Sequence, residues 1–225
     1  MPVQTQSIYR QEFGGLITLA VPLVLAQVAQ NTVSFVDTVM AGKISNDAIA
    51  GIALGSTTWY LLTFILSGVL LGLNPIVSQA NGSGDNDKIA CALRQSFLLC
   101  LVMVVPAVVL FWCSDSFFAL LDQPPEVSAQ STAYLRAISW GLLPAFGYMA
   151  LRATLEGLSD TRPILVTSVV CVGLNVLANY ALMFGHFGFP RLELVGAGYA
   201  SAFVLLCAFL MLLVYFIRTL SLIHI

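Results

Sequence analysis

The chain has 225 residues, a formal net charge of −2, 59% hydrophobic residues and only 9% charged residues. An ordinary soluble domain carries about 25% charged residues, so this chain has too little polar surface to cover a globule in water. The charge balance also excludes the basic footprint of a nucleic-acid-binding protein. These values predict an all-α integral membrane protein whose apolar surface faces the lipid bilayer.

Long apolar stretches recur along the whole chain. A helix needs about 20 mostly apolar residues to cross a hydrocarbon core of ~30 Å. Six stretches meet this requirement, which predicts a six-helix transmembrane bundle with spans at about Leu16–Met40, Ile49–Val77, Ala90–Cys113, Thr132–Leu151, Ile164–Phe184 and Val195–Ile217.

Residues that begin, end or bend helices stand at sensible places. Ser45 offers an N-cap for the second span, Pro163 fits the first turn of the fifth, and Gly185 ends the fifth. Four prolines lie inside predicted spans, where each removes a backbone donor and can kink its helix: Pro22, Pro75, Pro106 and Pro144.

Lysine and arginine in short loops indicate the orientation, because cytoplasmic loops carry more of them. With the N-terminus inside, the inner segments hold six such residues and the outer segments three: Arg10, Lys88, Arg94, Arg152, Arg162 and Arg218 against Lys43, Arg136 and Arg191. The sequence therefore predicts a multi-pass protein with a cytoplasmic N-terminus.

The first span carries a polar stripe. Gln27, Gln30, Ser34 and Asp37 are three or four residues apart, so they share one face of a helix. Such a stripe must face protein or a water-filled cavity, since lipid cannot satisfy it. Asp37 is the one acid that we place within a span, and an intramembrane carboxylate is a functional candidate by default. The alternative is that Asp37 lies at the membrane interface, since about 20 residues from Leu16 already cross the core.

Two asparagines share a face of the fifth span. Asn175 and Asn179 are four residues apart, and their carbonyl oxygens suit a bound cation. Equally, paired amides can hydrogen-bond neighbouring helices as structural contacts. The sixth span begins with Gly196 and Gly198, which permit close helix packing, and continues to Ser201, a further oxygen donor.

The sequence contains no nucleophile-elbow, zinc-protease or P-loop motif. His186 and His224 are the only histidines, and neither has a metal-binding partner at helical spacing. The five cysteines lie in or beside apolar runs without a paired spacing, which favours packing over a disulfide framework. We therefore expect neither an enzyme nor a protein with a bound cofactor.

Several separate segments resemble one transporter family. Gln27–Gly42 reads QVAQNTVSFVDTVMAG, which resembles the first-helix signature of the multidrug and toxic compound extrusion (MATE) family, close to its NorM branch. Pro75–Ile89 reads PIVSQANGSGDNDKI, and Leu151–Pro163 reads LRATLEGLSDTRP. Leu174–Gly198 contains LNVLANYALMFGHFGFP and then VGAG in the family order. The resemblance covers nearly the whole chain.

The resemblance implies a cation-coupled multidrug efflux antiporter of the cell inner membrane. Family members have twelve helices in two six-helix lobes, and this chain resembles the N-terminal lobe. The family's site for a coupling Na⁺ or H⁺ falls on Asp37, Asn175 and Asn179, with Ser201 where some members have threonine. Pro22 matches a first-helix proline that the family links to bending. Small cationic or amphiphilic drugs are the implied substrates, and the C-terminal lobe is the implied partner.

The end of the chain departs from the family pattern. The peptide Leu220–Ile225 reads LSLIHI, which a common transposon-based sequencing adapter encodes in one reading frame. We expect residues 1–218 to form the lobe and residues 219–225 to be an atypical tail from a truncated reading frame.

Two rival interpretations stay open from the sequence. A lipid-linked oligosaccharide flippase of the same broad fold group would carry more basic residues in its cavity than the nearly cation-free interior predicted here. The other rival is a non-transporting membrane scaffold or inactive half-protein, which drug export would separate from a transporter.

Overall fold

A computed structural model describes the backbone of residues 2–220 and the side chains of residue 13 and residues 15–219. Residues 221–225 of the predicted tail lie outside this part. The described backbone contains helices and no strand, which confirms the all-α prediction. The elements are α1 Pro2–Gly42, α2 Asn46–Ser67, η1 Gly68–Gly72, α3 Leu73–Ser83, α4 Asn86–Trp112, α5 Ser114–Leu120, α6 Pro125–Ile138, η2 Ser139–Gly141, α7 Leu142–Gly157, α8 Arg162–Phe184 and α9 Glu193–Leu220.

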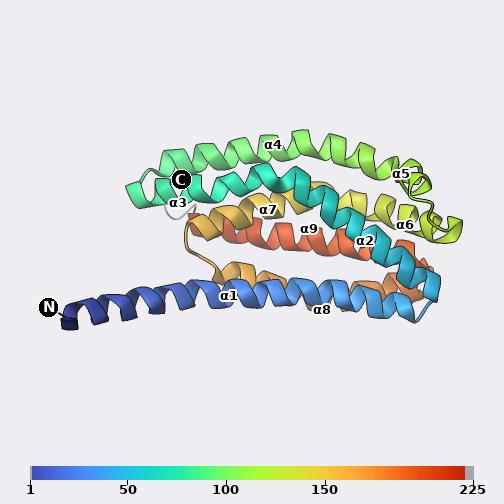
Figure 1. Cartoon of the computed structure of the whole chain (residues 1–225), viewed down its shortest axis with the longest axis horizontal. Helices are drawn as coiled ribbons and strands as arrows, with labels where there is room; N and C mark the ends of the chain where they lie inside the picture. Colours follow the sequence, from blue (N-terminus) through green and yellow to red (C-terminus); the bar gives the residue numbers. More distant parts are fainter. Residues whose placement is uncertain (1, 221–225) are drawn as a thin grey trace.

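Five helical segments in the described residues are long and apolar enough to cross a membrane: 15–42, 46–83, 86–112, 162–184 and 193–219. Five of the six predicted spans lie within them, except that Cys113 falls one residue beyond the third segment. The fourth predicted span, Thr132–Leu151, differs because it is divided among α6, η2 and α7, neither α-helix reaching 18 residues. Figure 1 shows α6 and α7 following one another along the bundle.

Prolines account for both breaks in the helical ladder. Pro144 is the third residue of α7 and follows η2, while Pro75 is the third residue of α3 and follows η1. A proline cannot bond the carbonyl four residues before it, and its ring crowds that carbonyl. In both cases this carbonyl, of Trp140 or Leu71, belongs to the 3₁₀ segment. The chain relieves the conflict by tightening one turn.

Helix ends follow the sequence signals. The Ser45 side chain accepts a hydrogen bond from the Ala48 backbone N–H at 3.0 Å, so the predicted N-cap of α2 is present. Pro163 occupies the first turn of α8. Gly185 ends α8 in the left-handed conformation with φ 75°, which a residue without Cβ adopts at little cost.

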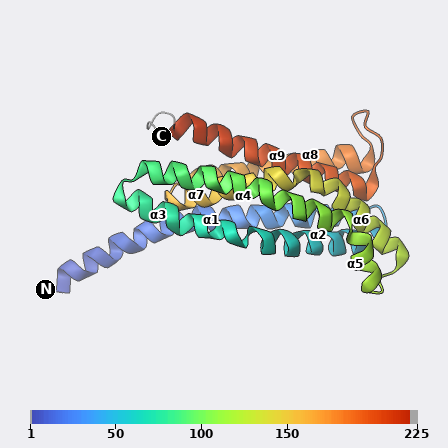
Figure 2. The same cartoon turned by 90° about the horizontal axis from the view of Figure 1, so that it is seen from above.

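The connections alternate between the two ends of the bundle. Figures 1 and 2 show the α1–α2 turn, α5 and the α8–α9 connection at one end. The α3–α4 turn and the α7–α8 connection lie at the other end, together with the N-terminal part of α1, which projects beyond its neighbours. This grouping agrees with the loops that the charge count assigned to opposite sides.

Small residues set the spacing of the helices around α9. A Cβ on Gly196 would lie 2.5 Å from the Leu182 carbonyl oxygen of α8, and a Cβ on Gly198 would lie 2.8 Å from the Tyr134 carbonyl oxygen of α6. The two glycines therefore let α9 approach α8 and α6 at backbone contact. Elsewhere in the interior, Trp59 and Phe111 stack with ring centroids 5.3 Å apart.

Candidate functional site

Asp37 of α1 lies at the centre of a buried polar cluster. Its Oδ1 accepts hydrogen bonds from the side-chain amides of Asn175 at 2.9 Å and Asn179 at 2.5 Å, both on α8. Its Oδ2 accepts a hydrogen bond from Ser201 Oγ of α9 at 3.4 Å. Asp37 is only 7% exposed and both asparagines are fully buried. The structure thus brings together all four residues that the resemblance assigned to cation coupling.

The local sequence explains this convergence. The spacing of four residues puts Asn175 and Asn179 on one face of α8, and Asn179 Nδ2 also donates to Asn175 Oδ1 at 3.2 Å. Asp37 lies within α1 rather than at its end, and it faces this pair. The close packing of α9 on α8 at Gly196 then brings Ser201 within reach. Asp37 is buried among these helices, so its carboxylate faces protein and not solvent.

One acceptor in the cluster has no hydrogen-bond donor. Asn179 Oδ1 is buried and has no partner among the described residues. Burying a polar atom without a partner costs free energy. A hydrogen-bond donor or a cation that binds next to Asn179 Oδ1 would remove this cost. A 180° flip of the side-chain amide of Asn175 or Asn179 would place its oxygen toward Asp37. The flip changes the shape of the side chain little, because the oxygen and nitrogen of an amide are of similar size. The cluster then offers carboxylate, amide and hydroxyl oxygens around one negative charge.

Tyr134 of α6 belongs to the same cluster, and sequence reasoning missed it. Its phenol interacts with the Ser201 side chain and lies close to Asp37 and Tyr60. The residue is 3% exposed. A Cβ on Gly55 would lie 2.7 Å from the Tyr134 ring, so a glycine on α2 makes room for it. The available signal was a tyrosine inside a predicted span, since Tyr134 lies within Thr132–Leu151.

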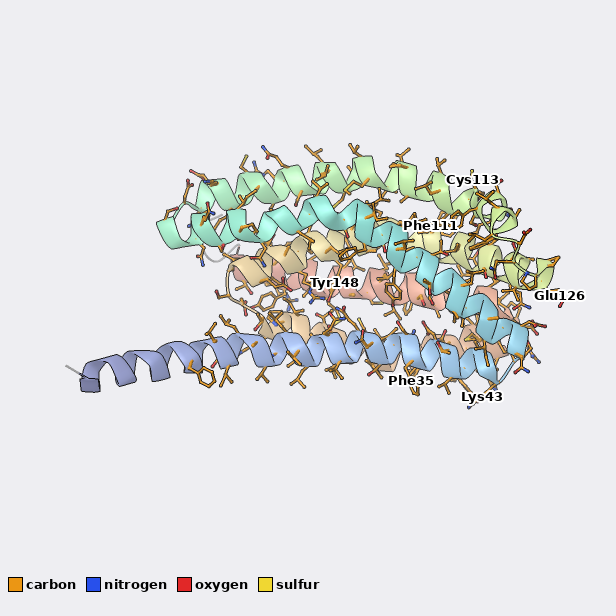
Figure 3. The ribbon with its side chains drawn as sticks, viewed as in Figure 1. Phe35, Lys43, Phe111, Cys113, Glu126 and Tyr148 are labelled. Carbon is orange, nitrogen blue, oxygen red and sulfur yellow. The ribbon has the colours of Figure 1, made fainter. Side chains whose placement is uncertain are left out.

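The other residues of the polar stripe on α1, Gln27, Gln30 and Ser34, contact different parts of the bundle. Gln27 is exposed and donates to Asn31 at 3.3 Å. Ser34 hydrogen-bonds the Tyr60 hydroxyl of α2 at 2.5 Å. Gln30 instead points toward α7, where its amide donates to the Tyr148 hydroxyl at 3.1 Å. Figure 3 shows Tyr148 in the space between α7 and α1. Gln27, Gln30 and Ser34 thus have different hydrogen-bond partners, and their place in the lining of a cavity stays a prediction.

A second polar network joins α1, α3 and α7. Arg152 pairs with Glu156 at 2.8 Å and donates to Gln30 Oε1 at 3.2 Å. Asn74 of α3 donates to the other Glu156 oxygen at 3.3 Å. Both charged side chains are largely buried, at 22% and 23% exposure. Arg152, counted above among the inner-segment charges, thus lies within α7, and Glu156 is the next-to-last residue of the same helix, outside the predicted spans.

Pro22 lies inside α1, which continues as one helix from Pro2 to Gly42. The bending role that the resemblance gives to Pro22 stays a prediction. The described residues contain no group of three or more histidine, cysteine, aspartate or glutamate side chains able to hold a metal. The cluster at Asp37 has a single carboxylate, whose charge one monovalent cation or one proton would balance.

Comparison with known sequences identifies one family. The MatE family matches residues 22–181. The multidrug resistance protein NorM of Photobacterium profundum is 36% identical over 207 residues, which cover 92% of this chain and 45% of that protein. The multidrug resistance protein MdtK of Klebsiella pneumoniae is 38% identical over 197 residues, covering 87% of this chain and 43% of that protein. The chain thus spans about half the length of these relatives.

Solved structures agree on the fold. An outward-facing MATE family transporter of the MOP superfamily superimposes with a TM-score of 0.80 at 18% identity, over 92% of this chain and 45% of that one. The eukaryotic MATE transporter AtDTX14 gives 0.81 at 17% identity, over 95% and 47%. A MOP superfamily transporter from Pyrococcus furiosus gives 0.77 at 17% identity, over 91% and 44%. The bundle therefore has the fold of one lobe of these transporters.

Proposed function

The chain belongs to the MatE family, and from that premise we propose that it is the N-terminal lobe of a cation-coupled multidrug efflux antiporter. The observation that carries the proposal is the buried carboxylate of Asp37, held by side chains from α8 and α9. Its relatives include multidrug resistance proteins, and the match covers a little under half of each of them, which is about the length of one lobe.

Coupling requires a group whose occupancy favours one conformation over another. A ligand shifts such an equilibrium only through different affinities for the two states. Asp37 and Asn179 lie on different helices, so a bound Na⁺ or H⁺ between them replaces the present amide-to-carboxylate hydrogen bond. We propose that this exchange changes the contact of α1 with α8. Pro22, lying fifteen residues before Asp37 in the same helix, is the proposed point of bending.

The proposed substrates are small cationic or amphiphilic drugs, and the proposed site of action is the cell inner membrane with the N-terminus in the cytoplasm. The relatives' names support multidrug resistance for those proteins. The charge count supports the orientation. The half-length match supports a C-terminal lobe as the partner that completes the cavity.

The largely buried guanidinium of Arg152 bears on the flippase alternative. Arg152 is the kind of residue that would bind an anionic head group. However, it is neutralised by Glu156 and held by Gln30, so the geometry gives no support to an anion site. We therefore retain drug efflux as the proposal.

Complementation tests the proposal. Residues 1–218 fused to the C-terminal half of the Photobacterium NorM relative should restore ethidium efflux to a bacterial strain that lacks its own efflux pumps. The chain expressed alone should not, because a single lobe lacks the opposite wall of the cavity. A properly inserted fusion without efflux would contradict the proposal, as would robust export by the lone chain.

A further inference from the structure

An apolar groove runs along the outside of the α1–α8 pair. It has a volume of about 380 Å³. Phe35 and Val39 line it from α1, and Val176, Leu177 and Tyr180 line it from α8. All five side chains are more than 40% exposed. The groove is thus an open channel on the surface of the bundle, directly outside the helix pair that holds Asp37.

A lone positive charge closes one end of this groove. Lys43 lines it one residue after the end of α1 and is exposed. Among the described residues it forms no ion pair with a carboxylate, whereas Arg136, Arg152 and Arg191 each do. Figure 3 shows Phe35 and Lys43 on the same outer side of α1, away from the interior of the bundle.

The length of the groove fits one leaflet of a bilayer. Eight residues separate Phe35 from Lys43, so the lined part of α1 is about 12 Å long at 1.5 Å per residue. Half of a hydrocarbon core is roughly 15 Å. The groove therefore begins within the acyl region, and Lys43 reaches the level of the head groups, as long basic side chains do near helix ends.

Aromatic side chains mark the same interface on α8. Tyr180 stacks on His186 with ring centroids 3.9 Å apart, and Phe187 packs edge-on against Tyr180. Tyrosine rings concentrate at the head-group level of membranes. The apolar wall thus gives way to aromatic rings and a cation at one depth, which is the polarity profile of a phospholipid.

We propose that this groove is a specific binding site for an anionic phospholipid of the surrounding leaflet. One acyl chain lies along Phe35, Val39 and Leu177, and the phosphate pairs with Lys43. The combination of an elongated apolar wall with an unpaired cation at its head-group end selects a lipid over a soluble anion. Because the groove and the Asp37 cluster share α1 and α8, lipid occupancy stabilises the contact between these two helices.

Native mass spectrometry of the 225-residue chain in detergent tests the site. The probes are phosphatidylglycerol and phosphatidylcholine with identical acyl chains. We expect phosphatidylglycerol to bind about fivefold more tightly, in line with one basic residue near an anionic surface. Lys43→Gln should abolish this preference. Arg191→Gln is the matched control, since Arg191 already pairs with Glu193 at 3.3 Å.

A second variant tests the apolar wall. Val176→Trp fills the groove and should weaken the binding of both lipids, while far-UV circular dichroism reports whether the helices persist. Equal binding of the two lipids by the unaltered chain would overturn the proposal, as would a Lys43→Gln variant that keeps the preference. Binding of glycerol phosphate without acyl chains as tightly as the lipid would also overturn it. A dimer that excludes lipid from the wild-type groove would assign the groove to a second copy instead.

Discussion

Gly196→Ala adds one methyl group where α9 crosses α8, and its cost follows from the geometry. The new Cβ would lie 2.5 Å from the carbonyl oxygen and 2.6 Å from the carbonyl carbon of Leu182, and 2.8 Å from the Met183 nitrogen. Ordinary contact begins at 3.4 Å. All three atoms are backbone atoms, so no rotamer change relieves the clash. The helices must separate by roughly 1 Å in a close-packed interior.

The magnitude is the difference of two effects. Overpacking of a well-packed interior costs about 1–3 kcal/mol. Replacing glycine by alanine in a helix gains up to about 1 kcal/mol. We therefore expect a net loss of up to about 2 kcal/mol in the free energy of unfolding.

A matched glycine separates the clash from helix propensity. Gly173 of α8 has no atom within 4 Å of its added Cβ, so Gly173→Ala gains propensity without crowding. Both variants are unfolded by SDS in mixed micelles and followed by far-UV circular dichroism. Gly196→Ala should unfold at a lower SDS fraction than the parent, and Gly173→Ala at the same or a higher one. If the two variants unfold at the same SDS fraction, α8 and α9 do not approach as closely at Gly196 as the structure indicates.

Three further outcomes follow. Single cysteines at Lys43, Asp122 and Phe187, on a background lacking the native cysteines, should react with an impermeant thiol reagent in intact cells, whereas one at Asn86 should not; the reverse pattern would invert the topology. Ser45→Ala should cost about 1 kcal/mol of stability in SDS unfolding because α2 loses its side-chain cap, whereas Ser45→Asp, which still caps, should cost little. Arg152→Leu should lower stability more than the double variant with Glu156→Gln, because the single change leaves a largely buried carboxylate without its partner. A double variant whose loss equals the sum of the two single losses would show that the pair is uncoupled.

The sequence predicted the course of the chain better than its interior. Apolar run length located the long helices, and Ser45 and Gly185 ended up at the helix boundaries that their chemistry favours. Hydropathy did not reveal the 3₁₀ turns before Pro75 and Pro144. A proline within an apolar run is compatible with a kink, a break or an uninterrupted helix, as Pro22 of α1 shows. Only the packing of neighbours decides between these outcomes.

For the candidate site, too, the sequence predicted the features of single helices better than the contacts between helices. Helical spacing placed Asn175 and Asn179 on one face, but their contact with Asp37 came from the family resemblance and is now given by geometry. Tyr134 and the contacts of the Arg152–Glu156 pair with Gln30 and Asn74 were missed because these partners lie far away in the chain. The Arg152–Glu156 pair itself has the i, i+4 spacing that a sequence shows. Arginine near a helix end was counted as a loop charge, although its long side chain folds back to Gln30. Spacing rules describe one helix at a time and cannot supply such contacts.

The most direct test of cation coupling is drug efflux by an Asp37→Asn variant of a full-length transporter that contains this lobe. The substitution keeps the size of the side chain and removes its charge, so the hydrogen-bonded cluster can persist while the proposed cation site is lost. Efflux of ethidium is measured against pH and Na⁺ concentration at matched expression, with Asn179→Ala as the milder change of a neutral ligand. We expect Asp37→Asn to abolish coupled efflux and Asn179→Ala to weaken it. Efflux by Asp37→Asn equal to the parent at every pH and Na⁺ concentration would contradict the account and make Asp37 a structural residue.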